Sequence, residues 1–401
     1  MPGRYVDLVW QHDPTAYAPA KHRRACRYRA FIPDRLGPMP LSLDADIMGV
    51  VSDAERSIRS LNADAQPALA PLARLLLRTE SIASSKVEGM QLGARELARA
   101  EARVEGGEKA SPTAMEILGN IDAMEVAVQD AARVDRFTVK EIVAIHRRLI
   151  AGSANSRIAG RIRTRQNWIG GNDYTPCGAD FVPPPPEDVD ALLTDLCDAV
   201  NDERLPPIVQ AALVHAQFET IHPFDDGNGR TGRALIHVVL RRRDIAPAYV
   251  PPISVVLAGS RDRYIDGLVG FRAGHVAGWA EQFAGADARA AHLARGYLAA
   301  VAQLTERWRA RLAKGADPRS DAAAWAVIDI LPGHPMITAP VAAAVTGRAK
   351  AAIYQAFGEL EAAGVLIPLS RSPRNRSWEA AGLLDLLGGL EAGRPPRGTR
   401  G

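Results

Sequence analysis

The sequence contains few cysteines and few aromatic residues, and both shortages limit the kinds of protein that it can encode. Only three of its 401 residues are cysteines, and Cys26, Cys177 and Cys197 lie far apart without metal-ligand spacing. An odd number of scattered cysteines favours reduced, structural thiols over a disulfide framework or a zinc site. Aromatic residues make up only 5% of the chain, so small apolar residues must fill much of the core.

Long apolar runs and charge of one sign are also missing. Residues 1–30 lack the apolar centre of a signal peptide, and no apolar run approaches the length of a membrane span. We therefore expect a cytoplasmic protein without a membrane partner. The 49 basic and 46 acidic residues leave a net charge of +3, which is too balanced for nucleic-acid binding by the whole chain. The length and the 47% hydrophobic content fit two or three globular domains.

The densest chemistry in the chain lies in HPFDDGNGRTGR, from His222 to Arg233. Its three glycines fit GxGxxG and nearly fit a P-loop, but both motifs follow a strand, whereas the apolar spacing from Pro207 onward predicts a helix. Dinucleotide binding is therefore disfavoured. The Gly-Asn-Gly turn, with a helix predicted from Thr231 to Arg243, still makes an anion site, because free N–H groups and the helix dipole meet there.

The side chains around this turn are those that a bound triphosphate needs. Arg230 and Arg233 lie three residues apart and point to similar sides of a helix, where they can grip phosphates. Asp226 can hold Mg²⁺ between phosphates. His222 is the one group of the segment that acts as a base near neutral pH.

The segment resembles the Fic motif, HxFx(D/E)GNGRxxR, and matches every specified position: His222, Phe224, Asp226, Gly227, Asn228, Gly229, Arg230 and Arg233. The resemblance implies transfer of AMP from ATP to a Ser, Thr or Tyr hydroxyl of a protein, including this protein itself, with His222 as the base. It also implies Mg²⁺ on Asp226, the α- and β-phosphates on Asn228 and the glycine amides, further phosphate contact from Arg230, and the γ-phosphate on Arg233. Phe224 would be structural. A plain helix end and surface turn would suit any one of these residues, but not all eight.

A second segment, Ser84 to Gly89, closes a helix predicted over residues 69–81. A capping box or a glycine stop is the structural alternative, but a capping box begins a helix, and here the helical pattern already runs into the segment. If Gly89 ends the helix, Glu88 is disfavoured there by about 0.3–1 kcal/mol and needs a cationic partner. The segment resembles the Fic inhibitory motif (S/T)xxxE(G/N) through Ser84, Glu88 and Gly89, in a class II-like arrangement. The resemblance implies that Glu88 pairs with Arg233 in place of the γ-phosphate.

Residues 160–186 combine β-prone pieces, a Gly-Gly-Asn-Asp turn and four prolines, which predicts a hairpin. In Fic proteins the comparable hairpin is a flap that aligns the target by main-chain pairing. That resemblance would give this role to Trp168, Ile169 and Gly170, with an ordinary packed hairpin as the alternative. We expect His146 to be a surface or packing residue, and Tyr264 to pack near Ser254 on the nucleotide side.

Together, these patterns predict a mainly α protein: a Fic helical core with a β-hairpin flap and a small C-terminal winged helix-turn-helix-like domain. The first forty residues are expected to be extended, and a linker is expected near Lys314. The expected divisions are an N-terminal helical segment at 1–110, the Fic core at 111–275, connecting helices at 276–317, the winged-helix-like domain at 318–393 and a disordered tail at 394–401. An exposed loop is expected from Arg103 to Pro112.

Two other functions stay open. The same site can remove AMP if Glu88 positions a water. Alternatively, the chain is a DNA-binding regulator with a nucleotide sensor, in which the helix from Lys350 enters the major groove beside a basic wing of Arg371, Arg374 and Arg376. Because that helix also carries Glu359 and Glu361, protein contact or homodimerisation fits the C-terminal domain equally well.

Overall fold

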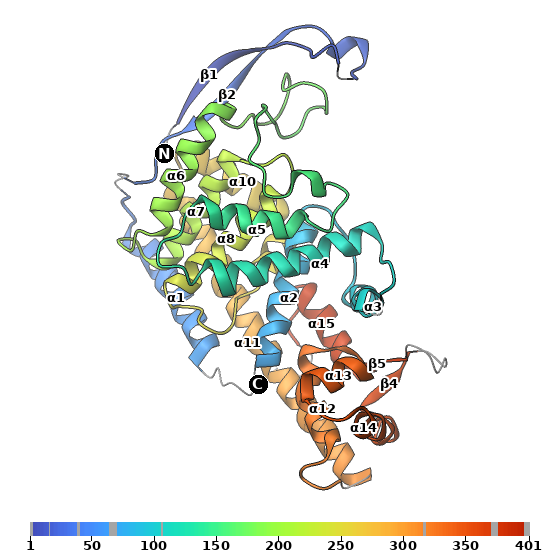
Figure 1. Ribbon diagram of the computed structural model, residues 1–401. Helices are drawn as coiled ribbons and strands as arrows, with labels where there is room; N and C mark the ends of the chain where they lie inside the picture. Colours follow the sequence, from blue (N-terminus) through green and yellow to red (C-terminus); the bar gives the residue numbers. More distant parts are fainter. Residues whose placement is uncertain are drawn as a thin grey trace.

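The structure is a computed structural model that describes residues 3–15, 17–37, 41–63, 70–105, 107–315, 318–369 and 376–396. Arg371, Arg374 and the end of the C-terminal tail, for which sequence predictions were made, lie outside these residues. The described chain is mainly helical with two small sheets (Figure 1), as the sequence predicts. Among its helices, none is both long and apolar enough to cross a membrane.

The centre of the fold is α7 (Pro207–Ile221), whose residues from Ile208 onward are all buried. A helix buried on every side belongs in the middle of a helical core. It packs against α8 (Asn228–Arg242), and the other core helices surround this pair. Those helices are α1 (Ala45–Ala63), α2 (Ala70–Val87), α4 (Pro112–Glu125), α5 (Val139–Ile150), α6 (Pro186–Val200), α9 (Ile253–Gly259), α10 (Arg261–Arg272) and α11 (Val276–Gly315).

Local signals account for most of these boundaries. α5 begins at Thr138 in a capping box, in which Glu141 Oε2 accepts a hydrogen bond of 2.7 Å from the Thr138 N–H. α2 continues to Val87, beyond the predicted end, and α8 begins three residues before the predicted Thr231. An additional helix, α3 (Ala94–Glu105), occupies the start of the segment from Arg103 that was expected to be a loop. One π-helical turn, Val126–Ala131, extends α4.

The N-terminal segment forms a β-hairpin and is not merely extended. β1 (Gly3–Trp10) pairs antiparallel with β2 (Cys26–Pro33), with Tyr5 opposite Phe31 and Trp10 opposite Cys26. Pro14 and Pro19 lie between the strands and Pro33 is the last residue of β2, so none of the three interrupts the middle of the ladder. Figure 1 shows the hairpin at one end of the molecule, next to the loop that follows α5.

A disulfide joins Cys26 of the hairpin to Cys177 of that loop, whereas Cys197 is free and buried. The prediction of three reduced thiols is therefore wrong for two of them, because the fold brings together residues 151 positions apart in the chain. Disulfides are typical of oxidising compartments, so the cysteines do not support the expectation of a cytoplasmic protein.

The flap hairpin predicted over residues 160–186 is reduced to a single antiparallel bridge between Ile169 and Phe181. Gly170 and Gly171 both have positive φ angles, of 74° and 75°, and these left-handed residues turn the chain away before a second pair of residues can form a ladder.

The C-terminal unit contains the three helices and the hairpin of a winged helix-turn-helix-like domain, together with one strand and one helix that the sequence did not predict. Three helices precede and accompany an antiparallel sheet of order β3-β5-β4. The missed helix is α15 (Leu383–Glu391). The others are α12 (Ala323–Ile330), β3 (Met336–Thr338), α13 (Ala339–Thr346), α14 (Lys350–Ala362), β4 (Leu366–Pro368) and β5 (Ser377–Ala380).

This unit packs closely on the rest of the protein. α11 runs as one helix up to Gly315, where a linker was expected to have begun. The side chain of Trp308 on α11 donates to the Ala381 carbonyl at 3.1 Å, and Arg95 on α3 pairs with Glu379 at 2.8 Å. α15 also contacts α2 (Figure 1), so the helix that carries Glu88 at its end is braced by the C-terminal unit.

Candidate active site

The catalytic motif forms a closed loop between α7 and α8. α7 ends at His222, which has the left-handed angles φ 50° and ψ 59°. The Asn228 side chain accepts from the Phe224 N–H at 2.9 Å and donates to the Phe224 carbonyl at 2.8 Å. Because this side chain is occupied within the loop, Asn228 can offer a phosphate only its backbone N–H, together with the other free N–H groups at the start of α8.

The side chain of His146 hydrogen-bonds to this loop and stacks on it, a role that its sequence context did not reveal. The buried imidazole accepts from the Gly160 N–H through Nδ1 at 2.9 Å, so Nε2 carries the proton and donates to the Asp226 carbonyl at 3.0 Å. The ring also stacks on Phe224, with 3.7 Å between centroids. Burial lowers the pKa of His146 to about 4, so this clamp is neutral at physiological pH.

His222 is half-buried at the turn. Burial lowers its pKa to about 4, with a smaller contribution in the same direction from Arg163. Its backbone carbonyl accepts from Arg163 Nε at 2.9 Å and from Asn167 Nδ2 at 3.2 Å. The backbone of His222 is therefore held in place, and its imidazole is uncharged at neutral pH, as a proton acceptor must be.

Arg230 is a buried cation with unused donors. Its closest carboxylates, on Asp226 and Glu116, are each 3.6 Å away. Among the described residues, Nε and Nη1 have no hydrogen-bond partner. Since an unpaired buried donor is costly, this arrangement favours an anionic ligand at Arg230.

Asp226 is the candidate metal ligand. Its half-buried carboxylate accepts from Asn155 Nδ2 at 3.0 Å and leaves part of its surface open. Within the described ranges no group of three His, Cys, Asp or Glu side chains could enclose a metal ion. One carboxylate nevertheless fits Mg²⁺ when phosphate oxygens and waters complete the coordination.

The inhibitory segment contacts the catalytic motif directly. Arg233 is buried, and its Nη2 donates to Glu88 Oε1 at 2.7 Å and to the Ser84 carbonyl at 2.8 Å, while Nε donates to Ser84 Oγ at 2.9 Å. Burial opposes the charge of Glu88, but attraction and hydrogen bonding by Arg233 outweigh it and lower the pKa of Glu88. Gly89 ends the segment with φ 84°. Glu88 thus has the cationic partner that its place at a helix end requires.

Glu88 also fills space in front of the α8 N-terminus. A Cβ atom at Gly229 would collide with Glu88 Oε1 and lie 2.9 Å from Arg233 Nη1. The carboxylate therefore lies against the glycine backbone where a bound anion would approach, and the two would compete for this position.

Asn167, the residue just before the expected flap, connects the flap to the catalytic loop by a hydrogen bond. Asn167 Nδ2 donates to the Phe224 carbonyl at 2.9 Å, and Trp168 Nε1 to the Asn172 carbonyl at 2.6 Å. Ile169 is 39% exposed, while Gly170 turns the chain directly after it. Arg163, which the sequence did not single out, is buried and donates to the Pro184 carbonyl at 2.6 Å.

Ser254 and Tyr264, which were expected near the nucleotide side, are both buried, and Tyr264 is a packing residue as predicted. Ser254 is buried, and its hydroxyl donates to Glu80 Oε1 at 2.6 Å. Tyr264 is buried and lies 2.9 Å from His215 Nε2 through its hydroxyl.

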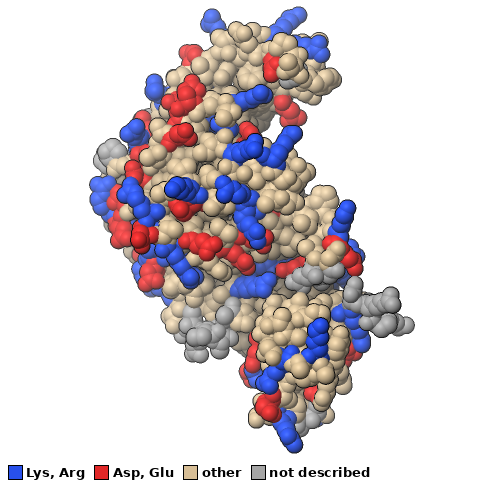
Figure 2. Space-filling view, viewed as in Figure 1, with Lys and Arg blue, Asp and Glu red and all other residues tan. Residues whose placement is uncertain are grey.

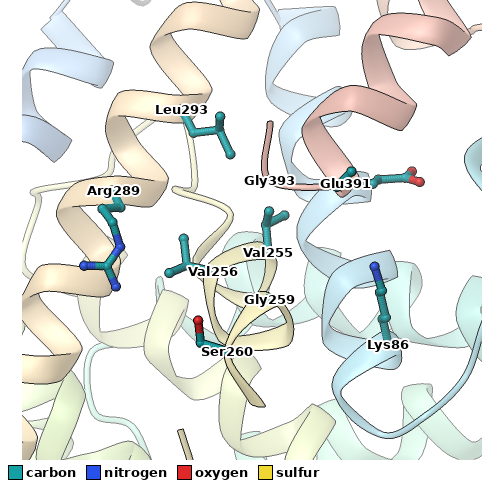
Figure 3. Close-up of a pocket in the computed structure, with 10 residues that line it drawn as sticks. Lys86, Val255, Val256, Gly259, Ser260, Arg289, Leu293, Glu391 and Gly393 are labelled. Atoms are coloured by element: carbon teal, nitrogen blue, oxygen red, sulfur yellow. The ribbon is translucent and has the colours of Figure 1, made fainter. Parts of the chain in front are cut away.

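An open cavity of about 350 Å³ is lined by residues of α2, α9, α11 and α15 (Figure 3). Lys86 of α2, Arg289 of α11 and Glu391 of α15 line it, and burial raises the pKa of Glu391 to about 7. None of its lining residues belongs to the catalytic motif. This cavity is therefore separate from the site built around His222.

Two family descriptions match this chain. Residues 136–240 match the Fic/DOC family, and residues 48–129 match the Fic/DOC family N-terminal region. The first range contains His222 to Arg233, and the second contains Ser84 to Gly89.

Curated relatives match over part of their length. The chain is 38% identical over 120 residues to protein adenylyltransferase fic-1 of Caenorhabditis elegans, which is 29% of this chain and 22% of that protein. It is 34% identical over 153 residues to protein adenylyltransferase Fic of Nematostella vectensis, which is 37% of this chain and 32% of that protein. The chain thus matches less than a third of the length of either relative.

The fold is also similar to a crystal structure of a Fic family protein from Desulfovibrio desulfuricans G20. The TM-score is 0.53 at 21% identity, covering 86% of this chain and 98% of the other. Such a likeness supports the fold alone. Residues 48–129 and 136–240 of this chain are therefore identified as a Fic/DOC family N-terminal region and a Fic/DOC domain, and each contains one of the two motifs.

Proposed function

We propose that the protein transfers AMP from ATP to a Ser, Thr or Tyr hydroxyl of a protein, itself included, and that Glu88 restrains this reaction. The observation that carries the proposal is one constellation: a neutral imidazole at His222, free N–H groups at the start of α8, and Arg230 with unused donors. Arg233, which completes the anion site, is held by Glu88 at 2.7 Å.

His222 accepts the proton of the target hydroxyl as its oxygen attacks the α-phosphorus. The new O–P bond forms as the bond between the α-phosphorus and the bridging oxygen breaks, and pyrophosphate leaves with that oxygen. The N–H groups of Gly227, Asn228 and Gly229 hold the α- and β-phosphates, and Arg230 stabilises the charge on them.

Asp226 would hold Mg²⁺. The ion would supply positive charge that neutralises the charge developing on the departing pyrophosphate. His146 and Phe224 keep the loop in position through the Asp226 carbonyl and the stacked rings.

Glu88 restrains transfer by occupying the place of the γ-phosphate on Arg233. ATP that enters while this ion pair persists cannot place its α-phosphate in line with the hydroxyl. Beyond the site, Trp168, Ile169 and Gly170 align the target segment, since Ile169 is part-exposed and next to the residues bound to the catalytic loop.

Label transfer from α-labelled ATP with Mg²⁺ tests this proposal in the wild type, in Glu88→Gly and in Glu88→Gly/His222→Ala. Loss of a charge-assisted contact of about 1.5–3 kcal/mol predicts roughly 10- to 100-fold stronger labelling in the single variant. The double variant should lose this labelling. Intact ATP binding without labelled protein would contradict the reaction, and undiminished labelling in the double variant would remove His222 from the base role.

A further inference from the structure

The β1–β2 hairpin and the loop of residues 168–181 form one exposed body, here called the hairpin platform. The Cys26–Cys177 disulfide links its two parts, and Trp10 packs edge-to-face on Trp168 with ring centroids 5.5 Å apart. The Phe31 N–H also donates to the Val182 carbonyl at 2.9 Å. Because this loop leads through Asn167 to the catalytic loop, whatever binds the platform is held close to the proposed reaction site.

β1 offers a free strand edge on this platform. Among the described strands, β1 pairs only with β2, in a two-stranded sheet. Its eight residues, Gly3–Trp10, therefore keep one row of N–H and C=O groups open along the outer edge. Such an edge is a template for pairing with another extended segment.

The outer face of the hairpin carries apolar and basic side chains and one carboxylate, Asp7. Tyr5 and Val9 are 57% and 59% exposed, and they lie on the face that also carries Arg27, which is opposite Val9, and Arg29. Tyr17, in the connection between the strands, is 81% exposed. Exposed apolar side chains gathered on one surface mark an interaction site.

The charge of the hairpin identifies the kind of partner. Residues 3–33 contain six Lys or Arg against two Asp, whereas the whole chain has a net charge of only +3. Figure 2 shows blue basic side chains at this end of the molecule. Asp7 lies opposite Arg29, yet no ion pair joins Arg27 or Arg29 to any described carboxylate, and the Arg29 guanidinium lies 4.8 Å from the Tyr5 ring centre. These cations are available to a negatively charged partner.

We propose that the hairpin platform docks an acidic, extended segment of the target protein, which adds to β1 as a third strand. Apolar side chains of the segment would cover Tyr5 and Val9, and its carboxylates would pair with Arg27 and Arg29. The identification of this partner as the target rests on the proposed function. The binding itself does not, because it requires no transfer of AMP.

Binding is measured with the full chain carrying His222→Ala, using fluorescence anisotropy of a peptide of alternating Glu and Val with one Thr. The same peptide with Lys in place of Glu is the comparison. The acidic peptide should bind more tightly, and Arg27→Glu/Arg29→Glu should weaken it about tenfold or more, equivalent to about 1.4 kcal/mol. Arg99→Glu/Arg103→Glu, an equal charge change on the exposed face of α3, should leave binding unchanged.

A charge-swap measurement shows whether the variant is still folded. Arg27→Glu/Arg29→Glu should bind the Lys peptide more tightly than the parent protein does, which a misfolded protein would not do. Equal affinity of the parent for both peptides, or acidic-peptide binding unaffected by the hairpin variant, would overturn the proposal. The proposal would also be overturned if the protein formed a dimer that Arg27→Glu/Arg29→Glu disrupts and that the peptide does not dissociate. In that case a second copy of the chain would occupy β1. Peptide binding without AMP transfer in the Glu88→Gly protein would count against the proposed function alone.

Discussion

His222 is the residue on which the proposed chemistry depends, and its protonation follows from its surroundings. Burial disfavours the charged imidazole and lowers its pKa to about 4, whereas the negative charge of Glu88 raises that pKa. At neutral pH the side chain is therefore already the base that proton transfer needs. Removing Glu88 should lower the pKa of His222 further.

This predicts the pH dependence of kcat/KM for AMP transfer by Glu88→Gly, a quantity that reports groups of the free enzyme. Because the pKa of His222 is lowered, the neutral form persists as pH falls. The rate should therefore stay level from about pH 8 down to about pH 5 instead of declining near 6.5. If kcat/KM instead declines around pH 6.5 while the affinity for ATP does not, His222 titrates as an ordinary exposed histidine.

His146 supports the same loop without being expected to meet the nucleotide. His146→Leu removes the donor to the Asp226 carbonyl and the acceptor for the Gly160 N–H. Leaving two buried groups unpaired should cost about 2–4 kcal/mol in the free energy of unfolding, measured by urea denaturation. The exposed His292→Leu is the control. A His146→Leu protein as stable as this control would contradict the clamp.

At the scale of secondary-structure elements, the site depends on how closely α7 and α8 approach. Gly232 on α8 faces Glu219, Phe218 and His215 of α7, and an added Cβ would lie 2.9 Å from Phe218 Cδ1 and 3.3 Å from His215 Nδ1. Burial raises the pKa of Glu219 to about 7, so the carboxyl in this contact takes up a proton more readily than an exposed glutamate does. The two helices can approach each other this closely only because position 232 has no side chain.

Gly232→Ala should therefore lower the free energy of unfolding by about 1–3 kcal/mol, as expected when an extra carbon is forced into a packed core. Gly278→Ala on α11 is the matched control, because nothing lies within 4 Å of its Cβ position. It should be neutral or stabilising by about 0.5–1 kcal/mol. Equal effects of the two changes in a denaturant titration would show that α7 and α8 can move apart freely.

For the whole molecule, two long-range connections matter most. The C-terminal unit packs on α2 and α3, so it braces the helix that ends at Glu88. Within that unit, Arg376 pairs with Glu361 at 3.1 Å and lies over the Trp378 ring. This arginine is thus engaged inside the unit.

The second connection is the Cys26–Cys177 disulfide, which closes a loop of 151 residues. Cys26→Ser/Cys177→Ser should reduce the free energy of unfolding by about 2–4 kcal/mol, because an unfolded chain without the link gains conformational freedom. Thermal unfolding with and without a reductant measures this change. The wild type in reductant should match the double variant, and a wild type insensitive to reductant would contradict a stabilising disulfide.

Much of the fold was predictable because its signals are local. The apolar spacing from Pro207 onward predicted α7, and the pattern from Thr231 to Arg243 predicted α8. α3 and α15 were missed although their sequences are helical, because glycine and charged residues beside them resembled loops. The hairpin was missed because its two strands lie fifteen residues apart, and only their pairing makes either one regular.

The sequence by itself determined the catalytic motif, the helices on both sides of it, and the need of Glu88 for a cationic partner. These depend on residue type and spacing over a few turns of chain. Only the tertiary structure decided the neutrality of His222, the clamp made by His146, the pairing of Cys26 with Cys177 and the joining of hairpin and loop into one surface. Burial and contact between distant segments exist only once the chain has folded, and each of these properties depends on one or the other.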